Sequence, residues 1–262
     1  MLGRDHALSG AAAFALLAPQ LHVTGAHLAA GTVLAAGAAV LPDIDHPDAT
    51  ISRTFGFLTG AFAWTVEKVS GGHRHGTHSV IGIAVFTALA WAADAWRNSG
   101  PVWQARQFPF GYLYGRPLSP WHLLPEMLLL ALLYSAGLRA LRIGGHHGDL
   151  LGILLAAATT WFGWDSGAVT GWHLPLAALI TGLGCACHIA GDEITHGGCP
   201  LAWPVSGHEF HLLPRPLLIT TSRLAERAIV FPLLLALLAL ALARDTGILH
   251  HLGHHQPGPL AG

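Results

Sequence analysis

Charged residues are scarce in this chain of 262 residues. Lysine, arginine, aspartate and glutamate together make up only 10% of it, whereas a typical soluble domain carries about 25% charged residues. Hydrophobic residues account for 52%, so the composition excludes an ordinary soluble domain and indicates an integral membrane protein. With a formal net charge of -1 the chain offers no basic surface of the kind that binds nucleic acid, and we expect no nucleic-acid partner.

Cysteine is equally scarce, and the chain lacks a polar linker. The three cysteines, Cys185, Cys187 and Cys199, have a spacing that suggests neither a disulfide framework nor a cysteine-based zinc site, and we interpret them as small buried hydrophobes. Because no linker separates two folding units, we expect a single membrane-embedded domain over residues 1–249. A flexible tail rich in histidine, glycine and proline is expected over residues 250–262.

Histidine, by contrast, is abundant, with 19 residues. Apart from the tail, the informative histidines belong to three short polar clusters, each at the end of an apolar run. The clusters are residues 41–46 (LPDIDH), 72–79 (GHRHGTHS) and 188–195 (HIAGDEIT). Imidazoles and carboxylates gathered at the ends of apolar helices are the arrangement expected of a metal centre at a membrane interface.

Seven apolar runs are suited to helices, and together they predict an all-α, polytopic membrane bundle. They occupy residues 7–21, 24–41, 78–96, 122–141, 149–163, 172–191 and 228–247. A full crossing takes about 20 residues, so the first and fifth runs are short, and we expect five to seven embedded helices, with seven as the central value. Apolar residues at steps of three or four also predict a short amphipathic helix in loop 42–77, lying either in the membrane interface or packed on the protein.

If all seven runs cross the membrane, the three clusters share one side of it. Nine of the 13 lysines and arginines fall on that side, which by the positive-inside rule faces the cytoplasm. This prediction depends on the short first run crossing fully. Membrane lipids are expected as partners, and the sequence leaves the oligomeric state open.

The first cluster places Asp43, Asp45 and His46 directly after Pro42, which closes a helix. An extended turn there could aim either carboxylate inward. Carboxylate and imidazole groups both ligate zinc, and carboxylates also suit manganese or magnesium. A simple polar helix stop is the competing interpretation.

The second cluster places His73 and His78 on either side of Arg74 and Thr77, among glycines that let the chain turn before an apolar helix. Thr77 could cap that helix, and the planar guanidinium of Arg74 is suited to binding phosphate or carboxylate oxygens in pairs. The alternative is a surface turn with solvated histidines.

The third cluster places His188 and Asp192 four residues apart, and hence on one face of a helix. They could ligate one metal, or Asp192 could orient a histidine ligand, with Thr195 on the same side. Glu193 points about 100° away from Asp192 in a helix, so it is a less favoured ligand and could be a base or simply a solvated side chain. A structural His–Asp pair is the alternative.

Together these segments resemble the YdjM-type family of membrane-bound, predicted metal-dependent hydrolases, known in bacteria partly as LexA-regulated inner-membrane proteins. The resemblance rests on the early His6, on the three clusters in their order, and on residues 198–204 (GCPLAWP). It implies a location in the bacterial inner membrane. It also implies a metal site with Arg74, Thr77 and Thr195 as supporting residues, lined by His6, Asp43, Asp45, His73, His78, His188 and Asp192. The family is loosely similar to zinc-dependent phospholipase C and to single-strand nucleases, which favours phosphoester substrates.

The sequence therefore predicts a membrane-bound hydrolase that uses a divalent metal to cleave a phosphoester or a lipid ester of a small-molecule or lipid substrate. Zinc is the expected ion, manganese and magnesium are alternatives, and the number of ions is open. Asp45 or Glu193 would accept the proton of the attacking water, and Arg74 would stabilise the developing negative charge. Two other functions remain open: a metal or ion transporter, and a non-catalytic protein whose metal only joins helices.

Overall fold

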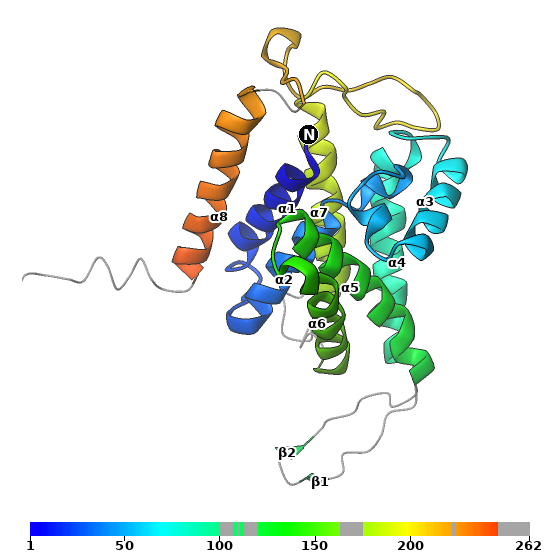
Figure 1. Ribbon diagram of the computed structural model, residues 1–262, viewed down its shortest axis with the longest axis vertical. Coiled ribbons are helices and arrows are strands. Elements are labelled where there is room, and N and C mark those ends of the chain that lie inside the picture. The colour runs from blue at the N-terminus through cyan, green and yellow to red at the C-terminus, as the bar shows by residue number, and fades with distance from the viewer. Residues whose placement is uncertain (100–106, 109–110, 113–119, 163–174, 222–223, 246–262) are drawn as a thin grey trace, which may run out of the picture.

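The computed structural model describes residues 1–99, 107–108, 111–112, 120–162, 175–221 and 224–245 (Figure 1). Within these ranges the chain forms eight α-helices, six shorter helices and one pair of two-residue antiparallel strands. The α-helices are α1 Gly3–Leu17, α2 Gly25–Ala38, α3 Phe57–Val69, α4 Val80–Asn98, α5 Pro120–Ala140, α6 Gly148–Phe162, α7 Leu176–Glu193 and α8 Phe231–Asp245. The shorter elements are η1 Pro42–Asp45, η2 Ile51–Arg53, η3 Gly76–His78, η4 Gly145–His147, η6 Arg215–Leu217, the π-helical η7 Glu226–Val230, and strands β1 Gln107–Phe108 and β2 Gly111–Tyr112.

Four helices, α1, α2, α5 and α7, form the centre of the bundle. α1 packs on α2 and α7, and α2 packs on α5 and α7. Their contact faces bury large side chains completely, among them Phe14, Leu34, Leu133 and Ile180. The peripheral helices α4, α6 and α8 instead expose large apolar side chains, as expected for helix surfaces that face lipid rather than water.

Glycines allow α2 and α5 to pass each other at close range. A Cβ atom built on Gly37 would overlap the backbone of Leu133, and one on Gly137 would lie 2.5 Å from the carbonyl oxygen of Val33. No side chain fits at this crossing, so the small residues of the two helices permit the close packing that drives helix association in lipid.

Replacing Gly37 by alanine should therefore destabilise the protein by about 1–3 kcal/mol, because the added methyl group forces the two helices apart. Thermal unfolding in detergent measures the effect. Gly60→Ala in α3 is the matched control, since nothing lies within 4 Å of the position of its added Cβ. Equal midpoints for the two variants would contradict this packing.

Among the described residues, four helical segments are long and apolar enough to cross a membrane. They are Gly25–Asp45, Val80–Asn98, Trp121–Ala140 and Glu226–Asp245. The all-helical membrane architecture is thus confirmed, whereas the expected five to seven embedded helices are not. The short first and fifth runs form α1 and α6, each of 15 residues, and the start of the sixth run lies outside the described residues. The tail over residues 250–262 also lies outside them, and its flexibility stays a prediction.

The short helix expected in loop 42–77 is α3. It packs beside η1 and η2, yet Phe57, Leu58 and Trp64 are 86%, 74% and 62% exposed. An outward apolar surface of this kind favours the interpretation as a helix in the membrane interface over that of a helix packed on the protein.

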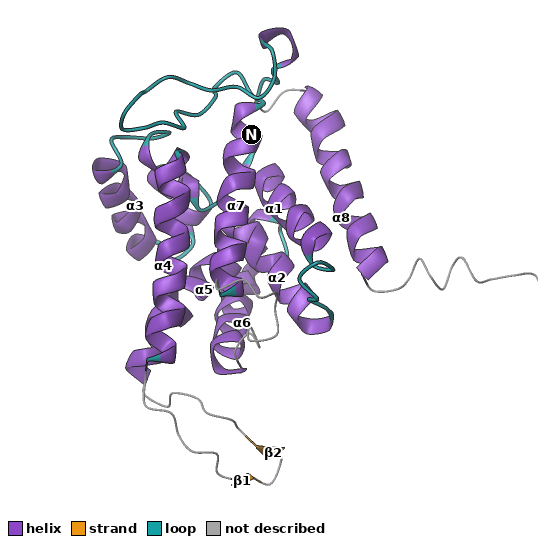
Figure 2. Ribbon diagram, turned by 180° about the vertical axis from the view of Figure 1, so that it is seen from behind, coloured by secondary structure: helices purple, strands orange, loops and turns teal. Residues whose placement is uncertain are grey.

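The three polar clusters meet at one end of the bundle. η1 follows α2 and contacts both η3 and α7, which brings the first cluster beside the second and the third. Figure 2 shows the long loop after α7 extending over the ends of α3 and α4. The backbone N–H of Val80 donates to the carbonyl of Leu201 in this loop, at 3.1 Å.

Candidate metal centre

The first cluster forms a tight 3-10 turn, η1, rather than the extended turn that we expected. The N–H of His46 donates to the carbonyl of Asp43 at 2.9 Å and closes the turn. A 3-10 helix has three residues per turn, so side chains two positions apart diverge. Asp43 and Asp45 consequently face different groups of histidine nitrogens.

The second cluster turns sharply before α4. Arg74 adopts a positive φ of 60°, and the helix begins at Val80, where the side chain of Ser79 accepts from the N–H of Gly82 at 3.2 Å. The prediction that Thr77 caps this helix is wrong, because η3 intervenes and the Thr77 hydroxyl donates to Asp45 instead.

The third cluster has the geometry that its spacing predicts. His188 and Asp192 are both buried on one face of α7, with Nε2 of His188 3.7 Å from Oδ2 of Asp192. The Thr195 hydroxyl donates to the backbone carbonyl of Asp192 at 2.7 Å, so Thr195 supports the helix end that carries the carboxylate.

Four ligand atoms from these clusters converge on one point. The Nε2 atoms of His78 and His188 lie 3.2 Å apart, and each lies 3.5 Å from Oδ1 of Asp43. Oδ2 of Asp192 lies 3.9 Å from the first imidazole and 3.7 Å from the second. Tetrahedral zinc with bonds of about 2.0–2.2 Å separates its ligand atoms by roughly 3.3–3.6 Å. The observed separations therefore fit a tetrahedral divalent ion with small adjustments.

Two further histidines extend this cluster. Nε2 of His6 lies 3.2 Å from Oδ1 of Asp192, and its ring stacks on that of His188 with centroids 3.8 Å apart. The ligand atoms of His6, His188 and Asp192 lie within 4.8 Å of one another, as do those of the second group, Asp43, His73 and His78. The two groups adjoin through His78 and His188, so the cluster could hold one ion or two.

The imidazoles are held in the orientation that a ligand needs. Nδ1 of His188 lies 2.7 Å from the carbonyl oxygen of Ala39, which only accepts, so Nδ1 carries the proton and Nε2 is free to bind metal. Asp45 orients the histidines of the second cluster in the way that the Ala39 carbonyl orients His188. The two oxygens of Asp45 lie 2.9 Å from Nδ1 of His73 and 3.6 Å from Nδ1 of His78.

Asp45 is fully buried and its oxygens are engaged. Besides the two imidazoles, it accepts hydrogen bonds from the Thr77 hydroxyl and from the backbone N–H of Arg74. These contacts favour a role in positioning the histidines over the predicted roles as ligand and base. Nothing in the sequence could have distinguished Asp45 from Asp43 in this respect.

Two cationic groups contact Asp192. Nη2 of Arg74 lies 3.3 Å from its Oδ2, and the amino group of Met1 lies 2.5 Å from its Oδ1. The sequence predicts Arg74 at the site, whereas no sequence pattern marks Met1. His46 belongs to the first cluster but not to the ligand set that the family resemblance implies, and its ring packs edge-on against that of His73 at 4.7 Å.

Glu193 lies apart from the cluster. Within the described part of the chain, no hydrogen bond or ion pair joins its carboxylate to the His and Asp side chains, and its Oε1 is buried without a partner. The predicted role of Glu193 as base has no support from these contacts.

The chemistry of the cluster fits a divalent metal. Four imidazoles and two carboxylates form two adjoining groups, each within ligand distance, and Nδ1 of the buried His6 has no hydrogen-bond partner among the described residues. Buried carboxylates at this density are costly unless a cation balances them. Nitrogen and oxygen donors suit zinc and also manganese, so the ligands do not decide which metal binds.

The comparison with known protein families agrees with this picture. The profile of the family described as "YdjM inner membrane protein" matches residues 1–248, which confirms the resemblance inferred from the sequence. No curated protein and no solved structure matches the chain. Because the match spans nearly the whole chain, and the chain has helices able to cross a bilayer, the protein belongs to the YdjM family of inner membrane proteins.

Proposed function

We propose that this protein is a metal-dependent hydrolase that cleaves a phosphoester or a lipid ester at the cytoplasmic face of the inner membrane. The observation that carries the proposal is the convergence of ligand atoms from three distant segments, with a guanidinium beside them. The Nε2 atoms of His78 and His188 and the carboxylates of Asp43 and Asp192 meet at one point.

One side of the cluster is accessible. His6, His188 and Asp192 are at most 1% exposed, whereas the side chains of Asp43 and His73 are 23% and 36% exposed. A metal that only joins helices has a closed ligand shell, while a catalytic metal keeps an open position. This asymmetry favours catalysis, with the substrate approaching from the Asp43 and His73 side.

Different residues of the cluster have different parts in the proposed reaction. A divalent metal, when bound, polarises the scissile group and lowers the pKa of a water molecule to about 7. Asp43 is a ligand that reaches solvent and is best placed to accept a proton there, because both oxygens of Asp45 are occupied. Arg74, 31% exposed and adjacent to Asp192, would bind the developing negative charge.

A transporter is less consistent with the arrangement. It requires ligands along a path through the membrane, whereas the polar clusters lie where candidate spans end, at Asp45, or begin, at Val80. A second buried charged group, in which Arg97 pairs with Asp94 and Glu126 at 3.0 Å each, lies at the opposite end of α4. The helix rise places it roughly 25 Å away, and its charges are paired with one another.

The finer membrane arrangement is part of the same proposal. α1 and α7 pack at the centre among the candidate spans and α6 packs on α5, so we infer that all three are embedded with them. Seven embedded helices place the cluster on the side that carries most arginines and lysines. That side faces the cytoplasm by the positive-inside rule.

Purified protein loaded with zinc should hydrolyse a member of a panel of phosphomonoesters, phosphodiesters and phospholipids, with activity lost on chelation and restored by metal. Arg74→Gln should lower kcat by roughly 100-fold while metal content is retained, because it removes a group that stabilises the transition state. Arg53→Gln is the matched control, since this arginine is exposed and pairs with Asp48. A fully loaded protein that cleaves none of these esters would overturn the proposal.

A further inference from the structure

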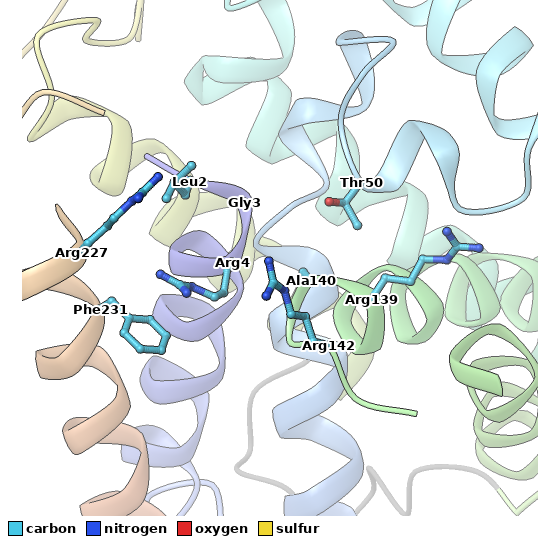
Figure 3. A pocket seen from close by; sticks show the side chains of 9 residues that line it. All are labelled: Leu2, Gly3, Arg4, Thr50, Arg139, Ala140, Arg142, Arg227 and Phe231. Carbon is cyan, nitrogen blue, oxygen red and sulfur yellow. The ribbon is translucent and has the colours of Figure 1, made fainter. Parts of the chain in front are cut away.

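A separate cavity of about 610 Å³ lies between α1, α5 and α8 (Figure 3). None of the residues of the metal cluster lines it. Its lining consists of Leu2, Gly3, Arg4, Thr50, Arg139, Ala140, Arg142, Arg227 and Phe231. Four of these nine residues are arginines and none is acidic, so the cavity is strongly basic.

Two of the four arginines are not balanced by a carboxylate. Nε of Arg4 lies 3.1 Å from Asp5, and Arg139 pairs with Asp149. Arg142 and Arg227 form no ion pair with any described residue. Two uncompensated guanidinium groups at one cavity attract an anion, and planar guanidinium groups bind phosphate oxygens in pairs.

The cavity wall is organised. The guanidinium of Arg4 lies over the ring of Phe231, 3.7 Å from its centroid, which fixes the group between α1 and α8. Figure 3 shows Arg4, Arg142 and Arg227 grouped around Leu2 and Gly3, with Arg139 extending away from the group. The positive groups therefore come from α1, from the turn after α5 and from η7, but they surround the same space.

Arg142 is held in an unfavourable backbone conformation. It follows α5 at the position where a helix commonly ends in glycine. The backbone N–H of Arg142 donates to the carbonyl of Arg139 at 3.1 Å, and that of Ile143 donates to the carbonyl of Leu138 at 2.8 Å. The φ of Arg142 is 58°, which costs a residue with a side chain roughly 1 kcal/mol. Such strain is typical of functional positions.

The cavity also lies at the depth of lipid headgroups. Arg227 stands at the start of the candidate span Glu226–Asp245, and Arg139 and Arg142 stand at the end of the span Trp121–Ala140. Two residues before and after the cavity-lining Phe231, Ile229 of η7 and Leu233 of α8 are 63% and 56% exposed, which gives this segment an outer apolar surface for acyl chains. Basic groups at the ends of membrane spans are suited to anionic lipids.

We propose that this cavity binds a phosphate group, namely that of an anionic phospholipid whose acyl chains lie against α8. The site is distinct from the metal centre and does not require that the protein be an enzyme. Phosphate oxygens would contact Arg142 and Arg227, and Arg4 would stabilise the headgroup from the wall formed with Phe231.

The test uses the full-length protein in detergent, titrated with phosphatidylglycerol, with zwitterionic phosphatidylcholine and with inorganic phosphate, and read by native mass spectrometry. Phosphatidylglycerol should bind most tightly. Arg142→Gly and Arg227→Gln should each weaken it by roughly fivefold. Arg142→Gly should at the same time raise the midpoint of thermal unfolding, because glycine relieves the strain at a positive φ. Arg215→Gln, an exposed arginine outside the cavity, should leave binding unchanged.

The outcomes separate the possible sources of phosphate. If inorganic phosphate binds with the same dependence on Arg142 and Arg227 while phosphatidylglycerol binds no better than phosphatidylcholine, the assignment to a lipid is overturned. If neither ligand responds to these two substitutions, the phosphate site itself is overturned. Metal content measured on the same samples should not change, so failure of the cavity proposal is distinguishable from failure of the metal centre.

Discussion

Replacing Asp192 by asparagine is expected to abolish metal binding while leaving insertion into the membrane intact. Oδ1 of Asp192 contacts His6, and its Oδ2 lies near both His78 and His188. Like Asp43, whose Oδ1 lies 3.5 Å from both His78 and His188, Asp192 therefore contacts both groups of candidate ligands, and it is the more deeply buried of the two carboxylates. Asparagine preserves the size of the side chain but removes the negative charge on which binding of a divalent cation depends.

The measurement is the metal content of the purified variant by elemental analysis, compared with that of wild-type protein isolated in the same way. Asp48→Asn is the matched control, because Asp48 lies at the same end of the bundle but is 68% exposed, and the ion pair it forms within the described part of the chain is with Arg53. Metal content close to zero is expected for Asp192→Asn and full content for the control. If Asp192→Asn retains its metal, this residue is not a ligand and the proposed centre is wrong.

Much of the helical arrangement could be predicted because long apolar runs constrain it. The runs 24–41, 122–141 and 228–247 correspond to α2, α5 and the segment of η7 and α8, with ends that differ by a few residues. The short runs 7–21 and 149–163 do form helices. Whether they cross the membrane is decided by packing against neighbouring helices, which periodicity does not report.

The site could be predicted in part, where its residues lie on one helix. His188 and Asp192 are linked by the geometry of a single helix, so their spacing predicts their contact. The division between Asp43 and Asp45 depends instead on a 3-10 turn and on histidines about 30 residues away, which local spacing does not reveal. Likewise, the angle of about 100° from Asp192 makes Glu193 a candidate base, but that angle does not reveal that no hydrogen bond or ion pair among the described residues joins its carboxylate to the cluster.

Asparagine in place of Asp45 should lower metal affinity by about 10–100-fold without abolishing it, the loss typical of residues that orient metal ligands. Asp45 accepts from Nδ1 of His73 and, through the Thr77 hydroxyl, holds Nδ1 of His78, so the ring protons lie on the Nδ1 atoms and both Nε2 atoms are left to bind metal. The ligand atoms themselves remain in the variant. Titration against a competing chelator measures the change.

A double-mutant cycle distinguishes this positioning role from that of a ligand. The hydroxyl of Thr77 donates to Asp45 and lies 3.0 Å from Nδ1 of His78, so it links the carboxylate to that imidazole, and Thr77→Val should weaken metal binding less than Asp45→Asn. The double variant should bind metal no more weakly than Asp45→Asn alone, because both substitutions break the same chain of contacts. Additive losses would show that Thr77 acts independently of Asp45. A complete loss of metal in Asp45→Asn, equal to that expected for Asp192→Asn, would instead make Asp45 a ligand.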